Sequence, residues 1–78
     1  MGIAAIINRA QVAGFQPSDI DTAADTKYYG YLAADGSWYI MQEITTAGTF
    51  RYIRGSSAYI TSWTGRAGLT YVYYSAMF

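Results

Sequence analysis

Three short hydrophobic runs of strand length follow one another in the middle of the chain, with glycine-containing turns between them. They occupy residues 28–33, 38–45 and 50–54. Within the second run, Trp38 and Ile40 fall on one parity, whereas the residues that follow each of them fall on the other. Because successive side chains of a strand point to opposite faces, this alternation indicates β-strands. We predict an antiparallel meander of three strands.

Two tight turns are expected to connect these strands. Asp35-Gly36 is a strong hairpin signal, because glycine takes a positive φ at no steric cost. Ala47-Gly48 is the second turn. Strands spaced by about ten residues, with turn residues between them, are typical of small all-β folds. We therefore expect an all-β domain, in which the meander and a further strand form a small sandwich or barrel.

The segment that follows the meander is rich in Ser, Thr and Gly, and we expect a short strand at residues 58–61. Large aromatic side chains dominate the burial in small cores, which favours a core position for Trp63 over a sugar-stacking one. Arg66 follows three residues later. It is expected to stack on Trp63 or a tyrosine, or to pair with Asp35 or Glu43.

Residues 69–78 are predicted to form the last strand, with apolar side chains on both of its faces. A strand of this kind is either central in a packed structure or buried against a partner. We expect another subunit to cover it. The interface candidates in this segment are Tyr71, Tyr73, Tyr74 and Phe78.

The first residues of the chain carry an apolar stripe at helical spacing, made of Ile3, Ile6, Ile7 and Ala10. The stripe suits a short amphipathic helix or an extended arm that crosses to a neighbouring subunit. An isolated helix shorter than about 12–15 residues is marginal unless it packs, which favours the arm. In either case we expect the stripe to lie in a contact between chains. We divide the chain into residues 1–25, an arm or short helix with a linker, and residues 26–78, a compact β-domain.

Residues 16–26 are expected to be a solvated linker. Ser18 and Asp21 have the spacing of a capping box, which suits one helical turn. Asp19 and Asp21 offer two hard oxygen ligands, but a calcium loop also needs further ligands, a turn glycine and a late bidentate Glu. We therefore predict no metal site in the linker.

Composition argues against several classes of function. The five basic residues equal the five acidic ones, so the basic patch typical of nucleic-acid binding is missing. No apolar run approaches the ~20 residues of a membrane span. The chain has no His, the usual general base, and no Cys. A glycosidase built on two carboxylates would need a cleft that so small a chain rarely encloses. We predict a protein that is not an enzyme and has no cofactor, no nucleic-acid partner and no membrane partner.

Composition also favours association between chains. Hydrophobic residues make up 53% of the sequence and charged residues only 13%, which is more apolar surface than one small core easily hides. Without cysteine, no disulfide can stabilise the fold, and oligomerisation is the remaining aid. The nine tyrosines suit interfaces, where an apolar ring and a polar hydroxyl are both useful.

A spaced series of aromatic, glycine and arginine residues runs through residues 19–78. It consists of Tyr29-Gly30, Gly36-x-Trp38-x-Ile40, Tyr52-x-x-Gly55 and Trp63-x-x-Arg66-x-x-Leu69-x-Tyr71. The series resembles that of small virion-associated proteins of tailed bacteriophages and prophages, which have a compact β-domain. The resemblance implies a structural part of the virion, such as a tail, fibre or capsid-accessory protein, and it carries over no catalytic residues. The implied partners are other copies of the chain and other virion proteins, with a host surface glycan as a further candidate.

Two classes of function follow from these observations. The first is a structural subunit that acts through assembly, and the second is a carbohydrate-binding module that stacks sugars on exposed aromatic rings. Burial of the aromatics against neighbouring chains would support the first class, and a solvent-facing row would support the second. The structural core is expected to contain Trp38, Ile40, Trp63 and Arg66, with Arg66 hydrogen bonded to backbone carbonyls or to a carboxylate.

Overall fold

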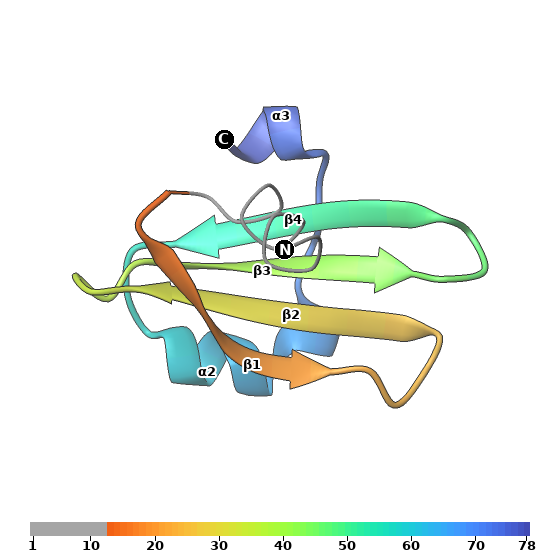
Figure 1. The fold of residues 1–78 in the computed structure, drawn as a ribbon, viewed down its shortest axis with the longest axis horizontal. Coiled ribbons are helices and arrows are strands. Elements are labelled where there is room, and N and C mark those ends of the chain that lie inside the picture. The colour runs from red at the N-terminus through yellow and green to blue at the C-terminus, as the bar shows by residue number, and fades with distance from the viewer. Residues whose placement is uncertain (1–12) are drawn as a thin grey trace, which may run out of the picture.

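In the computed structural model, which describes residues 13–78, each strand pairs with the next one along the chain (Figure 1). The antiparallel sheet has the order β1-β2-β3-β4. Its strands are β1 (Phe15–Asp21), β2 (Thr26–Ala33), β3 (Trp38–Ile44) and β4 (Thr49–Gly55). Three short helical segments follow, namely α2 (Tyr59–Thr64), η1 (Arg66–Gly68) and α3 (Tyr74–Met77). The all-β class and the antiparallel meander expected from the sequence are confirmed.

Both expected hairpins are present. Gly36 has a φ of +92°, and its N–H donates to the carbonyl of Ala33 at 3.0 Å. In the second turn, Gly48 has a φ of +67°, and its N–H donates to the carbonyl of Ile44 at 2.8 Å. Only glycine takes these conformations without strain, so the two turn signals in the sequence correspond to real backbone requirements.

The expectation of a solvated linker at residues 16–26 is wrong, because most of this segment is the edge strand β1. Its pairing with β2 runs from Phe15 opposite Ala33 to Asp21 opposite Tyr28. The expected helical turn at the capping-box spacing is therefore also wrong. An edge strand exposes one side to water, so polar side chains and a proline are tolerated there.

A β-bulge interrupts β1 at Ser18. Pro17 lies opposite Tyr31 and Asp19 lies opposite Gly30, so two steps along β1 correspond to a single step along β2. Neighbouring residues of β2 face opposite sides of the sheet, and the bulge therefore turns Asp19 away from the face that carries Pro17.

The sheet carries a hydrophobic cluster on each face. The α2-side cluster contains buried Tyr28, Trp38, Ile40 and Tyr59, with Leu32, Ile53, Trp63, Leu69 and Tyr71 packed against it. The α3-side cluster contains buried Tyr31, Tyr39 and Met41, with Phe15, Tyr29 and Tyr52 packed against it. Alternate residues of β3 enter the two clusters, as the alternation in its sequence predicts.

The short strand expected at residues 58–61 is wrong, because α2 begins at Tyr59. Tyr59 and Trp63 are four residues apart, which places them on one face of a helix. Their ring centroids lie 6.3 Å apart, and both side chains pack on the sheet. The helical spacing of these two aromatics explains why a helix, and not a strand, covers this face.

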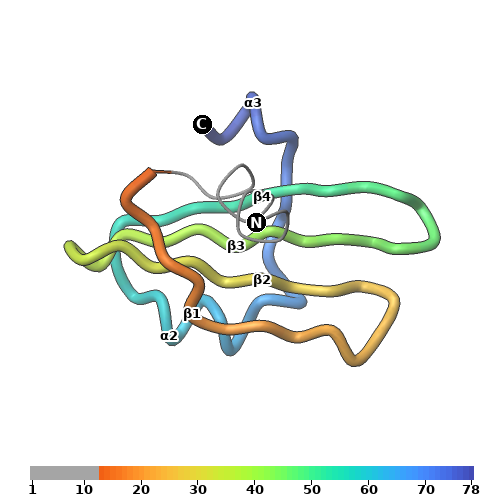
Figure 2. Tube along the Cα trace, viewed as in Figure 1, coloured from red at the N-terminus to blue at the C-terminus, as the bar shows by residue number. Residues whose placement is uncertain are grey.

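The strand expected at residues 69–78 is also wrong. Val72 makes an isolated bridge to Tyr52, with N–H···O distances of 2.7 and 2.9 Å, and the chain then forms α3. Figure 2 shows this segment crossing the sheet instead of running along a strand. It starts at the α2-side cluster with Leu69, passes the edge of β4, and ends with Phe78, whose ring lies 5.3 Å from that of Tyr39. The alternating residues therefore belong to a segment that wraps around β4 from one face of the sheet to the other.

Candidate interaction surfaces

Two glycines make room for the large side chains of the α2-side cluster. A Cβ at Gly55 would lie 2.5 Å from Cζ2 of Trp38, so glycine is required beside the indole ring. The indole Nε1 donates to the carbonyl of Ser57 at 2.7 Å, which satisfies the one polar group of this buried side chain. Trp38 and Ile40 are buried, and Trp63 is partly buried against them.

Gly30 has the same role for Tyr59. A Cβ at this position would overlap the hydroxyl of Tyr59, which passes over β2 to reach the edge strand. The hydroxyl donates to Oδ2 of Asp19 at 2.7 Å. Burial, together with this hydrogen bond to a carboxylate, raises the pKa of Tyr59 above its ordinary value. The phenol therefore stays protonated and holds β1 against α2.

Arg66 makes a second link to β1. The expected pairing of Arg66 with Asp35 or Glu43 is wrong, since its Nη2 lies 2.8 Å from Oδ2 of Asp21. Its Nη1 donates to the carbonyl of Trp63 at 2.8 Å, and its guanidinium lies 4.4 Å from the centroid of that ring. The hydrogen bond from Arg66 lowers the pKa of Asp21. Arg66 thus joins η1, α2 and β1, which is a structural role.

The two aspartates of β1 are therefore engaged by the fold and are not free to act as metal ligands together. Residues 13–78 contain no group of three or more His, Cys, Asp or Glu side chains that could hold a metal ion. Within the same range, no helix is long and apolar enough to cross a membrane.

The exposed aromatic side chains of residues 13–78 belong to β4 and the C-terminal segment. We call this region the arginine–aromatic edge, and its members are Phe50, Arg51, Arg54, Tyr73, Tyr74 and Phe78. The four rings are between 36% and 64% exposed. The guanidinium of Arg51 lies 4.1 Å from the centroid of Tyr73, and that of Arg54 lies 5.1 Å from the centroid of Phe78. Stacking of this kind holds each arginine at the surface beside an apolar ring.

The interface candidates from the sequence separate into three groups. Tyr73, Tyr74 and Phe78 belong to the arginine–aromatic edge. Tyr71 instead packs into the α2-side cluster, and its hydroxyl donates to the carbonyl of Arg66 at 2.8 Å. The candidates Ile3, Ile6, Ile7 and Ala10 lie outside the described residues.

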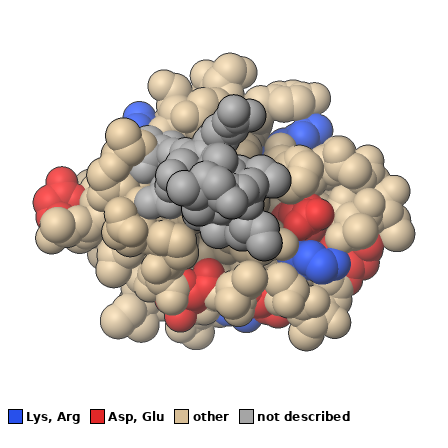
Figure 3. Space-filling view, in the orientation of Figure 1, with Lys and Arg blue, Asp and Glu red and all other residues tan. Residues whose placement is uncertain are grey.

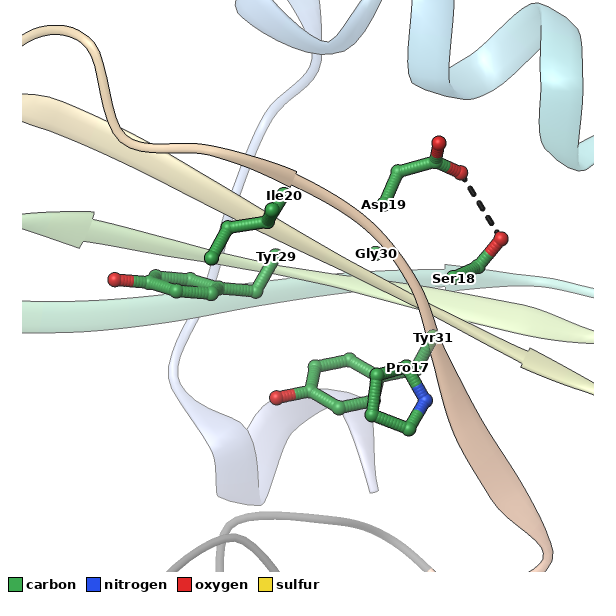
Figure 4. Close-up of a pocket in the computed structure, with 7 residues that line it drawn as sticks. All are labelled: Pro17, Ser18, Asp19, Ile20, Tyr29, Gly30 and Tyr31. Atoms are coloured by element: carbon green, nitrogen blue, oxygen red, sulfur yellow. Dashed lines mark hydrogen bonds between the residues drawn. The ribbon is translucent and has the colours of Figure 1, made fainter.

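A second surface lies at the opposite edge of the sheet, beside the bulge. A hollow of about 460 Å³, which we call the bulge groove, is lined by Pro17, Ser18, Asp19, Ile20, Tyr29, Gly30 and Tyr31. In Figure 4, Pro17 and Tyr31 lie on one side of the β1 ribbon, and Ser18 and Asp19 lie on the other. Ile20 is 67% exposed. The hydroxyl of Tyr29 donates to Glu43 at 2.8 Å, and burial together with Glu43 raises the pKa of Tyr29 to about 12.

Charged side chains occur near both of these surfaces. Across residues 13–78 the one ion pair is that of Arg66 with Asp21, so Arg51 and Arg54 have no carboxylate partner there. Figure 3 shows basic atoms on the upper rim, on the side of β4 and α3, and also in the lower half, where they lie among acidic atoms. Asp19 accepts hydrogen bonds from the hydroxyls of Tyr59 and Ser18, and Glu43 lies opposite Lys27 in the pairing of β2 with β3.

The sequence pattern did not reveal the bulge groove or the contacts of the two β1 aspartates. The partners of Asp19 and Asp21 lie 40 and 45 positions further along the chain, beyond the reach of any local pattern. No protein-family model, no curated protein and no solved structure matches this chain.

Proposed function

We propose that this chain is a structural subunit that acts through protein–protein assembly, and specifically a component of a bacteriophage virion such as a tail, fibre or capsid-accessory protein. Its partners are other copies of itself and other virion proteins. The observation that carries the assembly role is the arginine–aromatic edge, where four large rings are exposed along β4 and the C-terminal segment and two arginines stack on two of them.

Aromatic residues and arginine are enriched in protein interfaces and among the residues that contribute most to binding. Each ring of the edge presents an apolar face, and each stacked arginine presents N–H donors to a partner. The chain has no disulfide, and 78 residues bury only about 60–65% of the surface of the unfolded chain. Covering the edge with another subunit would therefore supply stability that the small core lacks.

The virion role is supported by the resemblance of the spaced series to small virion-associated proteins of tailed bacteriophages. Several members of the series have packing roles around the α2-side cluster, namely Gly30, Trp38, Ile40, Gly55, Trp63, Leu69 and Tyr71. Such positions specify a fold and carry no reaction chemistry. A resemblance between structural proteins is expected to rest on positions of this kind.

A carbohydrate-binding module is the second candidate. The exposed rings of Tyr73 and Tyr74 favour it, because a tyrosine offers a stacking face together with a hydroxyl. A sugar site also needs several convergent polar groups, whereas Phe50 and Phe78 add only apolar surface. The edge therefore suits a protein partner better than a sugar.

Native mass measured by light scattering at micromolar concentration tests the proposal. The wild-type chain should have a mass of two or more times the 8.6 kDa of one chain. The double substitution Phe50→Ser, Tyr73→Ser should shift the mass towards the monomer, because it removes two exposed rings. The matched control is Ile60→Ser, which changes an exposed hydrophobic residue of α2 and should leave the mass unchanged. A monomeric wild-type chain that binds glycans would contradict assembly and support the second candidate.

A further inference from the structure

We propose that the C-terminal segment, residues 69–78, is a guard that closes the outer edge of β4, and that β4 pairs with β4 of a second copy when this guard is displaced. The partner is a second copy of the chain, and the contact is made by backbone groups. It is therefore independent of the proposed virion role, which uses exposed side chains.

The guard meets the edge of β4 at one residue. The N–H of Tyr52 donates to the carbonyl of Val72 at 2.7 Å, and the N–H of Val72 donates to the carbonyl of Tyr52 at 2.9 Å. Within residues 13–78, no other backbone hydrogen bond joins the guard to β4. Side chains complete the cover on both faces, with Tyr71 in the α2-side cluster and Phe78 against Tyr39. One bridge and a few rings thus hold the edge closed.

The edge beneath the guard has the regular spacing of a strand that can pair. β4 pairs with β3 without a register shift. In an antiparallel strand, the backbone groups of alternate residues point to the same side. Because those of Tyr52 point away from β3 towards the guard, those of Phe50 and Arg54 point outward as well. Of these groups, the carbonyl of Phe50 accepts a hydrogen bond from Nη1 of Arg51 at 2.9 Å. The guard therefore covers only the centre of a three-residue pairing edge.

The opposite edge of the sheet is closed by its own sequence. Pro17 has no N–H to donate, and the bulge at Ser18 interrupts the regular spacing of backbone groups along β1. Both features make β1 a poor template for an added strand. The strands β2 and β3 are central in the sheet. Among the four described strands, β4 alone has a regular outer edge, so a second copy can present only its own β4.

The two copies of β4 fit together antiparallel about a two-fold axis. The register that pairs all three outward residues places Phe50 opposite Arg54 of the partner subunit, with Tyr52 on the axis. Residues directly opposite each other share a face of the sheet. The guanidinium of Arg54 lies 5.1 Å from the centroid of Phe78 in the guarded edge, and Phe50 of the partner subunit would replace that ring. A two-fold contact closes on itself, so displacement of the guard leads to a dimer and not to a filament.

A full-length variant with a weakened guard tests the pairing. Val72→Pro removes the N–H that donates to Tyr52, and Phe78→Ser removes the ring that packs on Tyr39. The matched control combines Val72→Thr with Phe78→Tyr, which keeps both the N–H and the ring. Circular dichroism establishes that each variant is folded. If the weakened-guard variant does not fold, Phe78→Ser alone takes its place.

Hydrogen exchange at individual backbone N–H groups is the first measurement. In the weakened-guard variant, the protection of Phe50 and Arg54 should rise about 10-fold or more with increasing protein concentration, because pairing between copies engages both N–H groups. In the control, their protection should not change with concentration. Equal behaviour of the variant and the control would overturn the guard.

Disulfide formation between two single-cysteine chains tests the register, since the chain itself has no cysteine. Phe50→Cys and Arg54→Cys are each introduced into the weakened-guard variant, and the two preparations are mixed and oxidised. Opposite residues of an antiparallel pair lie within the range of a disulfide, so a link between chains should form. Arg51→Cys replaces Arg54→Cys in the matched control, because its side chain faces the other side of the sheet. Equal linking in the two mixtures would overturn the pairing, whereas a monomeric wild-type chain would overturn the proposed function and leave the guard standing.

Discussion

Replacement of Gly30 by alanine tests how β1 is held to the rest of the fold. The new Cβ would overlap the hydroxyl of Tyr59 and would lie 3.0 Å from Cε3 of Trp63. Tyr59 must then move away from β2, and its hydrogen bond to Asp19 must break or lengthen. Gly30 has no side chain and pairs with β1 only through its backbone. The substitution should nevertheless loosen β1, because it displaces the tyrosine that holds this strand.

The expected loss of stability combines three effects. A hydrogen bond to a charged group contributes about 1.5–3 kcal/mol. Overpacking of a well-packed site costs about 1–3 kcal/mol. Alanine is favoured over glycine inside a strand by roughly 0.5–1 kcal/mol, which offsets part of this. We expect Gly30→Ala to lower the free energy of unfolding by about 2–5 kcal/mol, a large part of the total stability of a domain of this size.

Urea unfolding followed by the fluorescence of Trp38 and Trp63 measures this loss, because both indoles belong to the α2-side cluster. The midpoint should fall on the order of 1–3 M, at a fixed protein concentration so that association does not change. Gly68→Ala is the matched control, since a Cβ there meets no atom within 4 Å and its φ is not positive. It should leave the midpoint nearly unchanged.

A double-mutant cycle identifies the mechanism. Tyr59→Phe removes the hydroxyl with which the new Cβ would overlap, so Gly30→Ala should cost less in that background than in the wild type. The coupling between the two substitutions should exceed about 1 kcal/mol. Additive effects, or a Gly30→Ala protein as stable as the wild type, would refute this account of how β1 is held.

Three further substitutions test other parts of the fold. Gly36→Val should destabilise the chain by more than about 1 kcal/mol, because valine is strained at a φ of +92°, and an unchanged melting temperature would contradict this. Trp63→Ala should cost about 3–5 kcal/mol in urea unfolding by leaving a cavity against the sheet, whereas a folded mutant that has lost only glycan affinity would indicate a sugar site. The pKa of Asp21 is lowered in the folded state by Arg66, so its ionised form stabilises the fold above its ordinary pKa of 3.8. This stabilisation is lost as the pH falls through the lowered value, and Asp21→Asn should unfold with a weaker dependence on acid pH than the wild type.

The parts of the fold that the sequence predicts are those in which neighbouring residues interact. The hairpin at Gly36 depends on one backbone conformation and on hydrogen bonds within five residues. The alternation of Trp38 and Ile40 with their neighbours likewise reflects the geometry of a single strand. Local signals of this kind can be read without knowledge of the rest of the chain.

The features that were missed depend on residues far apart. The polar sequence of β1 resembles a loop, because the partners of Asp19 and Asp21 come from α2 and η1. The bulge also shifts the alternation within the strand, so that no period-two pattern runs through it. At the other end, the side chains from Leu69 onward alternate as in a strand, but they pack on the sheet from a segment that crosses it.

The same reasoning applies to the two candidate surfaces. Tyr73, Tyr74 and Phe78 were expected at an interface because they are apolar residues in excess of what one small core needs, and they are exposed in the fold. The bulge groove could not be predicted, because its lining residues combine an unrecognised strand with the aromatic face of β2. A surface formed by two strands becomes visible only when their pairing is known.

The bulge at Ser18 sets the faces of β1 without depending on the identity of the side chain at its centre. Ser18 is exposed, so many residues could replace it without a change in the core. A straight strand that kept Ser18 would place Pro17 and Asp19 on the same face of the sheet, and either the link to Tyr59 or the packing of Phe15 would be lost. Loss of Ser18 would instead make Pro17 and Asp19 consecutive residues, which lie on opposite faces of a regular strand. Among relatives of this chain, position 18 should vary freely in residue type, and chains that lack it should keep the same pairing of β1 with β2.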